Sequence, residues 1–269
     1  MQRTSIAYLI SLSLLVSLIS CQNNQVPIGQ RFRIKKVTKQ GDQQLSTDTY
    51  NYDNQGRLDN IYKTYTQRSK GFNRDYYYTT VFQYNAQGKL SSIIYQPDYK
   101  APGTIKPSRY DYLYDVNGTI TTIRNFYISP DTANNRTFNL VYNGNKFPVK
   151  ITSINDAFKD GYTTEYTYNN GNVAEIKTSN FNNTGEVTSS LTRTYQFDAK
   201  PNPFYNLYTG APDSELFNDN AFKLNTFYQS NTFNENNTLY PDATYEYDAN
   251  GNLVKITSFV TTTLEYEVY

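Results

Sequence analysis

Histidine and cysteine, two residue types that commonly carry out catalysis, are absent or nearly absent from this chain of 269 residues, so an enzyme would have to use carboxylates, Ser, Lys or Tyr. The chain contains no histidine and a single cysteine, Cys21, so histidine-based triads and histidine-ligated zinc or iron are excluded. A glycosidase needs only two carboxylates at a fixed separation, and the candidate acids are Asp156, Asp160, Glu165, Glu175, Glu186, Asp213 and Glu215. No spacing marks two of these acids as a pair. We therefore expect a protein without catalytic residues and without a cofactor.

The single cysteine follows an apolar N-terminal segment. The run Ser5–Ile19 would be about 22 Å long as a helix, shorter than the roughly 30 Å hydrocarbon core of a bilayer. Its length and composition are those of a signal peptide. It ends in Leu18-Ile19-Ser20-Cys21, which resembles the bacterial lipobox, a small residue in front of a thiol that accepts a diacylglyceryl group. We expect residues 1–20 to be removed and Cys21 to be the lipid attachment site, which leaves no thiol for catalysis.

The remaining chain has a balanced charge. The whole chain has 25 basic and 24 acidic residues, and removal of residues 1–20 takes away only Arg3. A balanced surface disfavours nucleic acid as a partner. Because Gln22 and Asn23 do not supply the aspartate that retains lipoproteins in the inner membrane, we expect anchoring in the outer membrane. No acidic export cluster follows, which favours the periplasmic face over the cell surface.

A repeat organises the rest of the chain. Each unit has two aromatic residues two positions apart, then Asp or Asn, then a glycine turn; clear copies are Tyr50–Leu58, Phe82–Leu90, Tyr112–Ile120 and Tyr245–Leu253, and shorter ones are Tyr166–Val173 and Leu140–Phe147. The unit predicts a β-hairpin in which the Asp or Asn side chain starts the turn and glycine takes the positive φ. Turns such as Asp115–Gly118 lack the further acids of a calcium loop, so we expect no metal.

An apolar residue recurs five positions after the glycine, as at Ile61 and Ile123. Leu58 and Ile61 are an odd number of residues apart and would point to opposite faces of a regular strand. Either a bulge lies between them or both faces of the sheet are partly covered.

The repeats predict an all-β fold, an antiparallel meander of roughly fourteen strands that curls into a barrel-like or open curved sheet. After a linker at residues 21–30, residues 31–269 are expected to form a single domain. Phe197-Asp198 is interpreted as one more aromatic-Asp position. An irregular excursion follows at 199–243, with a short helix near 219–225. Aromatic residues of the excursion that lie outside the repeat form a candidate binding patch: Tyr205, Tyr208 and Phe217.

The hairpin units resemble YD repeats, the Tyr-Asp-x-x-Gly units of RHS-type bacterial surface and toxin-shell proteins. Together with the lipobox and the segment Phe197–Phe204, they are similar to a group of lipoproteins of the Bacteroidetes, some with a porin-like, barrel-forming meander. The resemblance covers most of residues 31–269. It implies an architecture and no reaction. The chain has neither the long repeat array nor the C-terminal effector domain of RHS toxins, so a toxin role is not expected.

Three functions remain open from the sequence. The first is a non-enzymatic cell-envelope lipoprotein whose β scaffold binds a glycan, a peptide or a partner protein. The second is an outer-membrane pore, which would need an outward apolar band about 25 Å tall, whereas expected strand centres carry residues such as Lys63 and Arg193. The third is a carboxylate-based glycan hydrolase.

Overall fold

A computed structural model describes residues 32–69, 72–97, 107–128, 135–144, 147–204, 236–239 and 241–269. All regular structure in these ranges is β-strand, in agreement with the predicted all-β class. The strands are β1 (Phe32–Gly41), β2 (Gln44–Tyr52), β3 (Leu58–Ser69), β4 (Phe72–Tyr84), β5 (Leu90–Pro97), β6 (Ser108–Tyr114), β7 (Ile120–Tyr127), β8 (Arg136–Tyr142), β9 (Pro148–Asn155), β10 (Gly161–Asn169), β11 (Asn172–Phe181), β12 (Val187–Thr194), β13 (Gln196–Pro201), β14 (Asn236–Leu239), β15 (Thr244–Tyr247), β16 (Leu253–Thr257) and β17 (Thr261–Val268).

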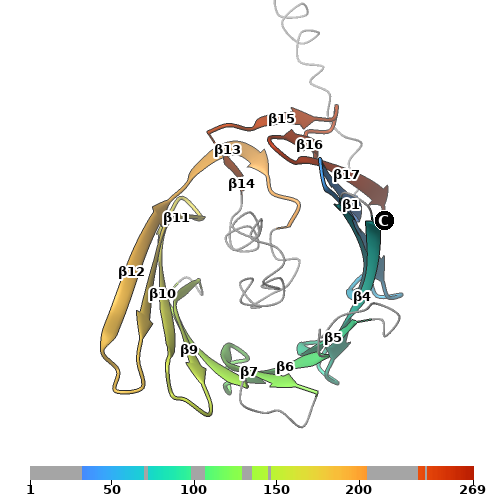
Figure 1. The fold of residues 1–269 in the computed structure, drawn as a ribbon. Helices are drawn as coiled ribbons and strands as arrows, with labels where there is room; N and C mark the ends of the chain where they lie inside the picture. The colour runs from blue at the N-terminus through green and yellow to red at the C-terminus, as the bar shows by residue number, and fades with distance from the viewer. Residues whose placement is uncertain are drawn as a thin grey trace, which may run out of the picture.

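Fifteen of these strands form one antiparallel sheet in the order β12 to β1, then β17, β16 and β15. The sheet curls almost into a ring, and β1 pairs with β17, so the two ends of the described chain lie side by side (Figure 1). Among the described strands, β12 and β15 are the two edges, and β13 pairs only with β14 in a separate two-stranded sheet. Of the two predicted shapes, a barrel-like sheet and an open curved sheet, the meander therefore has the second.

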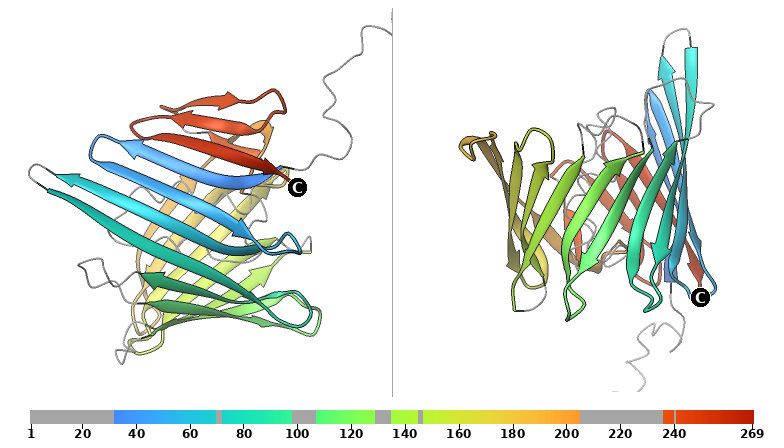
Figure 2. Two further views of the ribbon diagram at one scale, coloured as in Figure 1. Left: turned by 90° about the vertical axis from the view of Figure 1, so that its right-hand side faces the viewer. Right: turned by 90° about the horizontal axis from the view of Figure 1, so that it is seen from below.

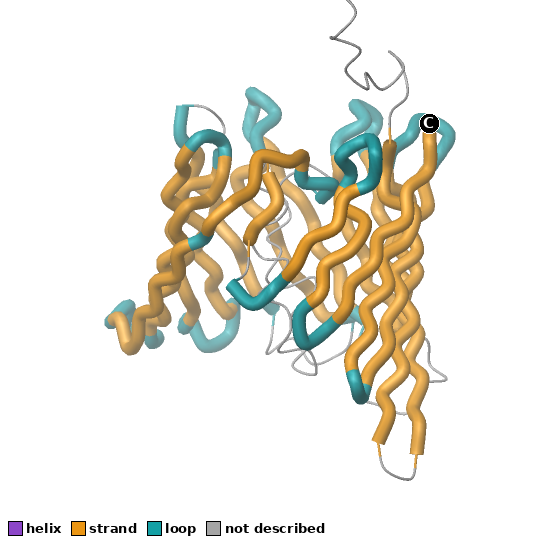
Figure 3. Tube along the Cα trace, turned by 90° about the horizontal axis from the view of Figure 1, so that it is seen from above, coloured by secondary structure: helices purple, strands orange, loops and turns teal. Residues whose placement is uncertain are grey.

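The strands tilt across the sheet, and their turns collect along two rims (Figures 2 and 3). Because consecutive strands are antiparallel, the glycine turns of all six predicted units fall on one rim, which we call the glycine-turn rim. The first residue of β1 and the end of β17 lie on the same rim. The opposite rim carries the β9–β10 turn (156–160) and the β11–β12 turn (182–186).

The glycine turns have the predicted hydrogen bonds. In the first unit, Asp53 Oδ1 accepts bonds from the backbone N–H groups of Gln55 and Arg57, each 2.9 Å long, and Gly56 has a φ of 78°. Asp115 and Asp248 accept the corresponding bonds in their own turns. These carboxylates are engaged by the backbone, which explains why an acid recurs at this position.

A seventh turn of the same kind, which the repeat pattern did not predict, lies between β11 and β12. Asn182 Oδ1 accepts bonds from the N–H groups of Thr184 and Glu186, and Gly185 has a φ of 85°. The unit Phe181–Gly185 carries an aromatic residue, Asn and a glycine in the expected order, but it has a single aromatic in front of the turn. It lies on the rim opposite the other glycine turns, because it connects β11 to β12 and so comes one strand after the glycine turn between β10 and β11.

A bulge after each full glycine turn resolves the odd spacing of the apolar residues. Tyr52 is opposite Leu58, whereas Asn51 is opposite Asn60, so Asp59 is the additional residue. The same shift occurs between Gln83 and Tyr84, Leu113 and Tyr114, Val141 and Tyr142, Thr167 and Tyr168, and Glu246 and Tyr247. As a result Leu58 and Ile61 are both on the inner face, each 4% exposed.

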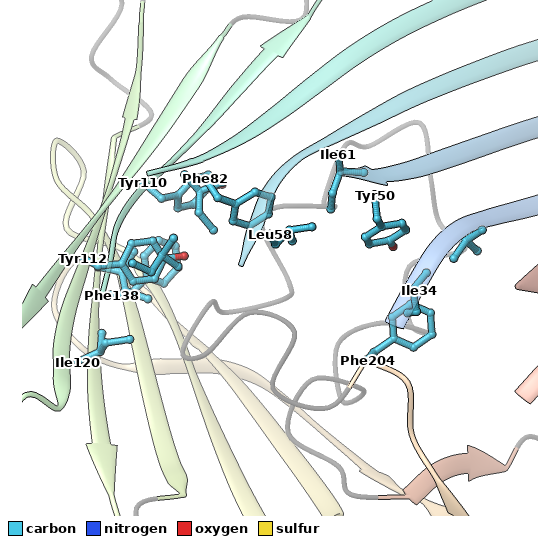
Figure 4. Close-up of a cluster of buried hydrophobic side chains, with 14 of the residues drawn as sticks. Ile34, Tyr50, Leu58, Ile61, Phe82, Tyr110, Tyr112, Ile120, Phe138 and Phe204 are labelled. Atoms are coloured by element: carbon cyan, nitrogen blue, oxygen red, sulfur yellow. The ribbon is translucent and has the colours of Figure 1, made fainter. Parts of the chain in front are cut away.

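The core lies on the concave face of the sheet (Figure 4). Ile93, Ile123 and Phe138 are fully buried there, and Phe204, just after β13, is packed into the same cluster. The repeated aromatic residues contribute to this core: Tyr50 and Tyr112 are buried, and the second tyrosine of five of the six units packs against the cluster from the glycine-turn rim. The exception, Tyr168, packs against a smaller cluster of Val173 and Ile176.

In four of the six units the hydroxyl of the second tyrosine donates a hydrogen bond to a carbonyl of the preceding strand. Tyr84 donates a hydrogen bond to the carbonyl of Leu58 (2.8 Å), and Tyr114 donates one to the carbonyl of Leu90 (2.6 Å). In the first two clear units a cation follows the turn glycine and lies over the next tyrosine ring: the Arg57 guanidinium carbon is 4.3 Å from the Tyr84 ring centroid, and Lys89 Nζ is 5.3 Å from that of Tyr114. The bonded hydroxyl explains why the repeat uses tyrosine rather than phenylalanine.

The predicted irregular excursion at 199–243 needs correction at its described ends, and Asp198 differs from the other aromatic-Asp positions. Ala199–Pro201 belongs to β13 and Asn236–Leu239 forms β14, so the described ends of the excursion are paired strands. Asp198 starts no glycine hairpin. Its carboxylate accepts hydrogen bonds from Asn237 on β14 and from the Tyr247 hydroxyl on β15, and it joins the small sheet to the edge of the large one. The predicted helix near 219–225 lies outside the described residues.

Gly118→Val is expected to destabilise the fold by about 1 to 3 kcal/mol, because a β-branched residue at the φ of 78° is strained. A side chain there would also collide with Lys89 Nζ. Gly251→Val should behave in the same way. The control is Gly144→Ala, since a Cβ at Gly144 meets no atom within 4 Å. Unchanged thermal melting of both valine variants would contradict the turn geometry.

The free energy of unfolding is expected to rise between pH 7 and about pH 10. Burial lowers the pKa of Lys39 to about 7, opposed by Asp48 and reinforced by Lys63. The unfolded chain binds more protons over this interval, so stability increases with pH. Above pH 10 it should fall, since burial raises the pKa of Tyr84 to about 12. Denaturant titration should give a flatter profile from pH 7 to 10 for Lys39→Met, and an unchanged profile would refute the assignment.

Candidate functional site

Most residues singled out from the sequence do not meet in a site. Cys21, Tyr205, Tyr208 and Phe217 all lie outside the described residues. Asp213 and Glu215 do so as well.

Three of the described candidate acids are engaged separately. Asp156 accepts a hydrogen bond from Thr137 (2.9 Å), and Glu186 accepts one from Asn182 (3.3 Å). Glu165 pairs with Lys150 at 3.6 Å. Of the other two described acids, Glu175 lies on β11 and Asp160 lines a cavity.

That cavity, which we call the rim pocket, has a volume of about 590 Å³ and opens on the rim opposite the glycine turns. It extends from β8 to the start of β12 and is lined by Arg136, Phe158, Asp160, Gly161, Tyr162, Asn180, Phe181, Asn182, Asn183 and Thr188. Its size lies within the usual range for small-molecule sites, about 300 to 1,000 Å³. The lining combines three aromatic rings with amide, hydroxyl and charged groups.

A rigid turn presents Phe158 at the pocket. Asn155, 3% exposed at the end of β9, accepts hydrogen bonds through its side-chain oxygen from the backbone N–H groups of Ala157 and Phe158, at 2.9 and 2.8 Å. Its carbonyl accepts a third bond from Lys159, which has a positive φ of 61°. The turn therefore holds its conformation without help from Phe158, whose side chain remains 59% exposed.

Gly161 allows the strands behind the pocket to approach closely. A Cβ at this position would collide with the carbonyl of Ser153 and lie 2.9 Å from the Phe181 ring. Phe181 is directly opposite Gly161 in the β10–β11 register. The missing side chain thus makes room for the Phe181 ring at the pocket wall.

The polar groups of the pocket are partly engaged. Arg136 lies over the Tyr162 ring at 5.9 Å and donates to the hydroxyl of Ser153 (3.3 Å), which fixes its guanidinium against the inner face. Within the described part of the chain, no hydrogen bond or ion pair is formed by the side chains of Asp160 and Asn183. The Asp160 carboxylate, which accepts hydrogen bonds, and the Asn183 amide, which both donates and accepts them, are therefore available beside the aromatic rings.

Asp160 is the only carboxylate in the lining, so the pocket does not provide the pair of acids that glycoside hydrolysis requires. The described residues contain no cluster of three or more potential metal ligands. They also include no helix long and apolar enough to span a membrane.

The sequence contains the residues that build the rim pocket, but no motif distinguishes them from other residues. Asn155, Gly161 and Phe181 are each ordinary residues of a strand end, and they belong to three different strands. Only the sheet register brings them together with Arg136.

No protein-family model and no curated protein matches the chain. Among solved structures, a porin-like protein from Bacteroides uniformis is 15% identical, with a TM-score of 0.50 and coverage of 87% of this chain and 96% of that one. The TcdB2-TccC3-Cdc42 complex is 16% identical over 79% of this chain and 12% of that one, with a TM-score of 0.34. The first likeness shows that the chain shares an all-β fold with a porin-like Bacteroides protein.

Proposed function

We propose that the protein is a non-enzymatic lipoprotein of the cell envelope, anchored through Cys21, that binds a glycan in the rim pocket. The observation that carries the proposal is Phe158, an exposed aromatic ring on a rigid turn beside the unpaired side chains of Asp160 and Asn183. Sugars offer apolar C–H faces that pack on aromatic rings and hydroxyls that bond to carboxylates and amides. Three rings and several amides suit that chemistry.

The position of the pocket supports a tethered receptor. Phe32, the first residue of β1, lies on the glycine-turn rim, and the pocket opens on the opposite rim. Cys21 lies eleven residues before Phe32, so the lipid would be at most about 40 Å from the start of β1 along an extended chain. The tether would therefore enter from one rim and leave the pocket facing away from it.

A second candidate, an outer-membrane pore, is raised by the Bacteroides neighbour that is described as porin-like. The outward face of the sheet argues against it. Ile176 is buried, so Lys177 points outward, and it is directly opposite Glu165, which also pairs with Lys150. A lysine near the midplane of a bilayer costs roughly 2 to 4 kcal/mol.

The test is a glycan-binding screen, followed by calorimetry with the best ligand, on the anchor-free protein in which serine replaces Cys21. Phe158→Ala and Asn183→Ala should each lower the affinity at least tenfold without changing the melting temperature. Phe259→Ala is the matched control, because Phe259 is 81% exposed and lies on the same rim, in the β16–β17 turn. Equal binding by wild type and Phe158→Ala would overturn the proposal, and so would a screen without any ligand.

A further inference from the structure

The edge strand β12 differs from every other strand of the sheet. All eight of its residues are exposed, and among the described strands it pairs only with β11. It contains neither proline nor lysine, the residues that usually protect an edge from pairing. The other edge, β15, has four residues and is held to β13 through Tyr247 and Asp198. β12 is therefore the edge with both the length and the access to receive another strand.

The hydrogen bonds of β11 identify which backbone groups of β12 are unused. The N–H of Tyr195 donates to the carbonyl of Ala174 at 3.0 Å. Backbone bonding alternates along an antiparallel pair, so Arg193 and Leu191 also direct their N–H and C=O groups to β11. The backbone groups of Ser190, Thr192 and Thr194 consequently point away from the sheet.

We propose that β12 pairs with β12 of a second copy of this chain, antiparallel about a twofold axis at Leu191. In this register Ser190 of one copy is opposite Thr192 of the other, and each such pair exchanges two backbone hydrogen bonds. The two sheets then form one continuous sheet across the axis. The interface is isologous, which is the usual form of a symmetric dimer.

The side chains favour a second copy as the partner. Leu191, 54% exposed, lies on the axis and meets its own counterpart, which buries an apolar surface that the single chain leaves in water. Arg193 falls opposite Ser189 of the second copy, so the two cations do not face each other. Ser190, whose hydroxyl already forms a 2.8 Å hydrogen bond with that of Ser179 on β11, lies opposite Thr192 of the second copy, a cross-strand pair of the type that stabilises sheets.

Cysteine cross-linking tests the register, because Cys21 is the only cysteine of the chain. In the Cys21→Ser background, Leu191→Cys places two thiols across a position where the Cα atoms are about 4.5 Å apart, within the range of a disulfide. Mild oxidation should convert most of this variant to a covalent dimer on a non-reducing gel. In a homodimer of Ser189→Cys the two thiols would be about 13 Å apart at 3.4 Å per residue, and the same holds for Arg193→Cys. Each variant alone should therefore form no covalent dimer. A mixture of the two should cross-link, because position 189 of one copy lies opposite position 193 of the other.

Two substitutions at one position test the backbone bonds. Thr192→Pro removes an outward N–H that β11 does not use, so the variant should be monomeric in sedimentation velocity. Its melting temperature should be close to that of the unsubstituted protein at a dilution where that protein is also monomeric. Thr192→Val keeps the N–H and should remain dimeric. The proposal is overturned if the unsubstituted anchor-free protein is monomeric up to 100 micromolar (about 10⁻⁴ M, a weak-interface limit), or if Ser189→Cys homodimers form in place of Leu191→Cys homodimers.

Discussion

Replacing Cys21 by serine is expected to move the protein from the membrane fraction to the soluble fraction and to abolish its labelling by radioactive fatty acid. A single lipid-bearing thiol is the proposed anchor, so the effect should be close to complete. Metabolic labelling followed by membrane fractionation measures both changes. Ser17→Ala serves as the control, because this residue of the apolar run precedes the lipobox. Undiminished label, or retention of the Cys21→Ser protein in the membrane, would contradict the proposed attachment site.

The released protein should fold as a soluble β protein without detergent. Its outward face carries charged pairs such as Lys255 with Glu246, 2.7 Å apart, while the apolar side chains lie on the concave face. This is the arrangement of an antiparallel sheet with one solvated face. Circular dichroism without detergent tests whether the protein folds in water, and planar-bilayer conductance tests whether it forms a pore. A precipitate that becomes β-rich only in detergent and conducts ions would replace the receptor proposal by the pore.

Asn155→Ala is expected to lower the free energy of unfolding by about 2 to 4 kcal/mol, because it leaves the N–H groups of Ala157 and Phe158 without their acceptor in a partly buried turn. The Phe158 ring would lose its fixed position, so glycan affinity should fall as well. Chemical denaturation and calorimetry measure the two effects.

Asn155→Asp keeps an acceptor oxygen and should lose less stability than Asn155→Ala. Asn60→Ala is the surface control, since the bond between the Asn51 and Asn60 side chains is exposed and such changes usually stay within about 0.5 kcal/mol. If Asn155→Ala melts like the wild type, the turn is not held as described and Phe158 has another support.

The repeat in the sequence was enough to predict the local structure. An aromatic pair, an Asp or Asn and a glycine specify a hairpin through contacts within about ten residues, so the turns at Asp53, Asp115 and Asp248 were predicted correctly. The spacing of Leu58 and Ile61 posed a choice between a bulge and a two-sided sheet. The register of the two strands shows that a bulge is present, because an additional residue can be recognised only from which residues lie opposite each other.

The remaining features depend on contacts between distant segments. Asp198 resembles the other aromatic-Asp positions locally, yet it bonds Asn237 and Tyr247, 39 and 49 residues away. The rim pocket likewise combines Arg136 with residues as distant as Thr188.

The sequence by itself determined the all-β class, the meander and the hairpin turns, since each follows from period, turn chemistry and nearest-neighbour pairing. Only the tertiary structure decided the open curvature of the sheet, the exposed edge at β12 and the rim pocket. Curvature accumulates from the twist and bulges of many strands, and a pocket on a rim exists only once that curvature brings the ends of β8 to β12 together.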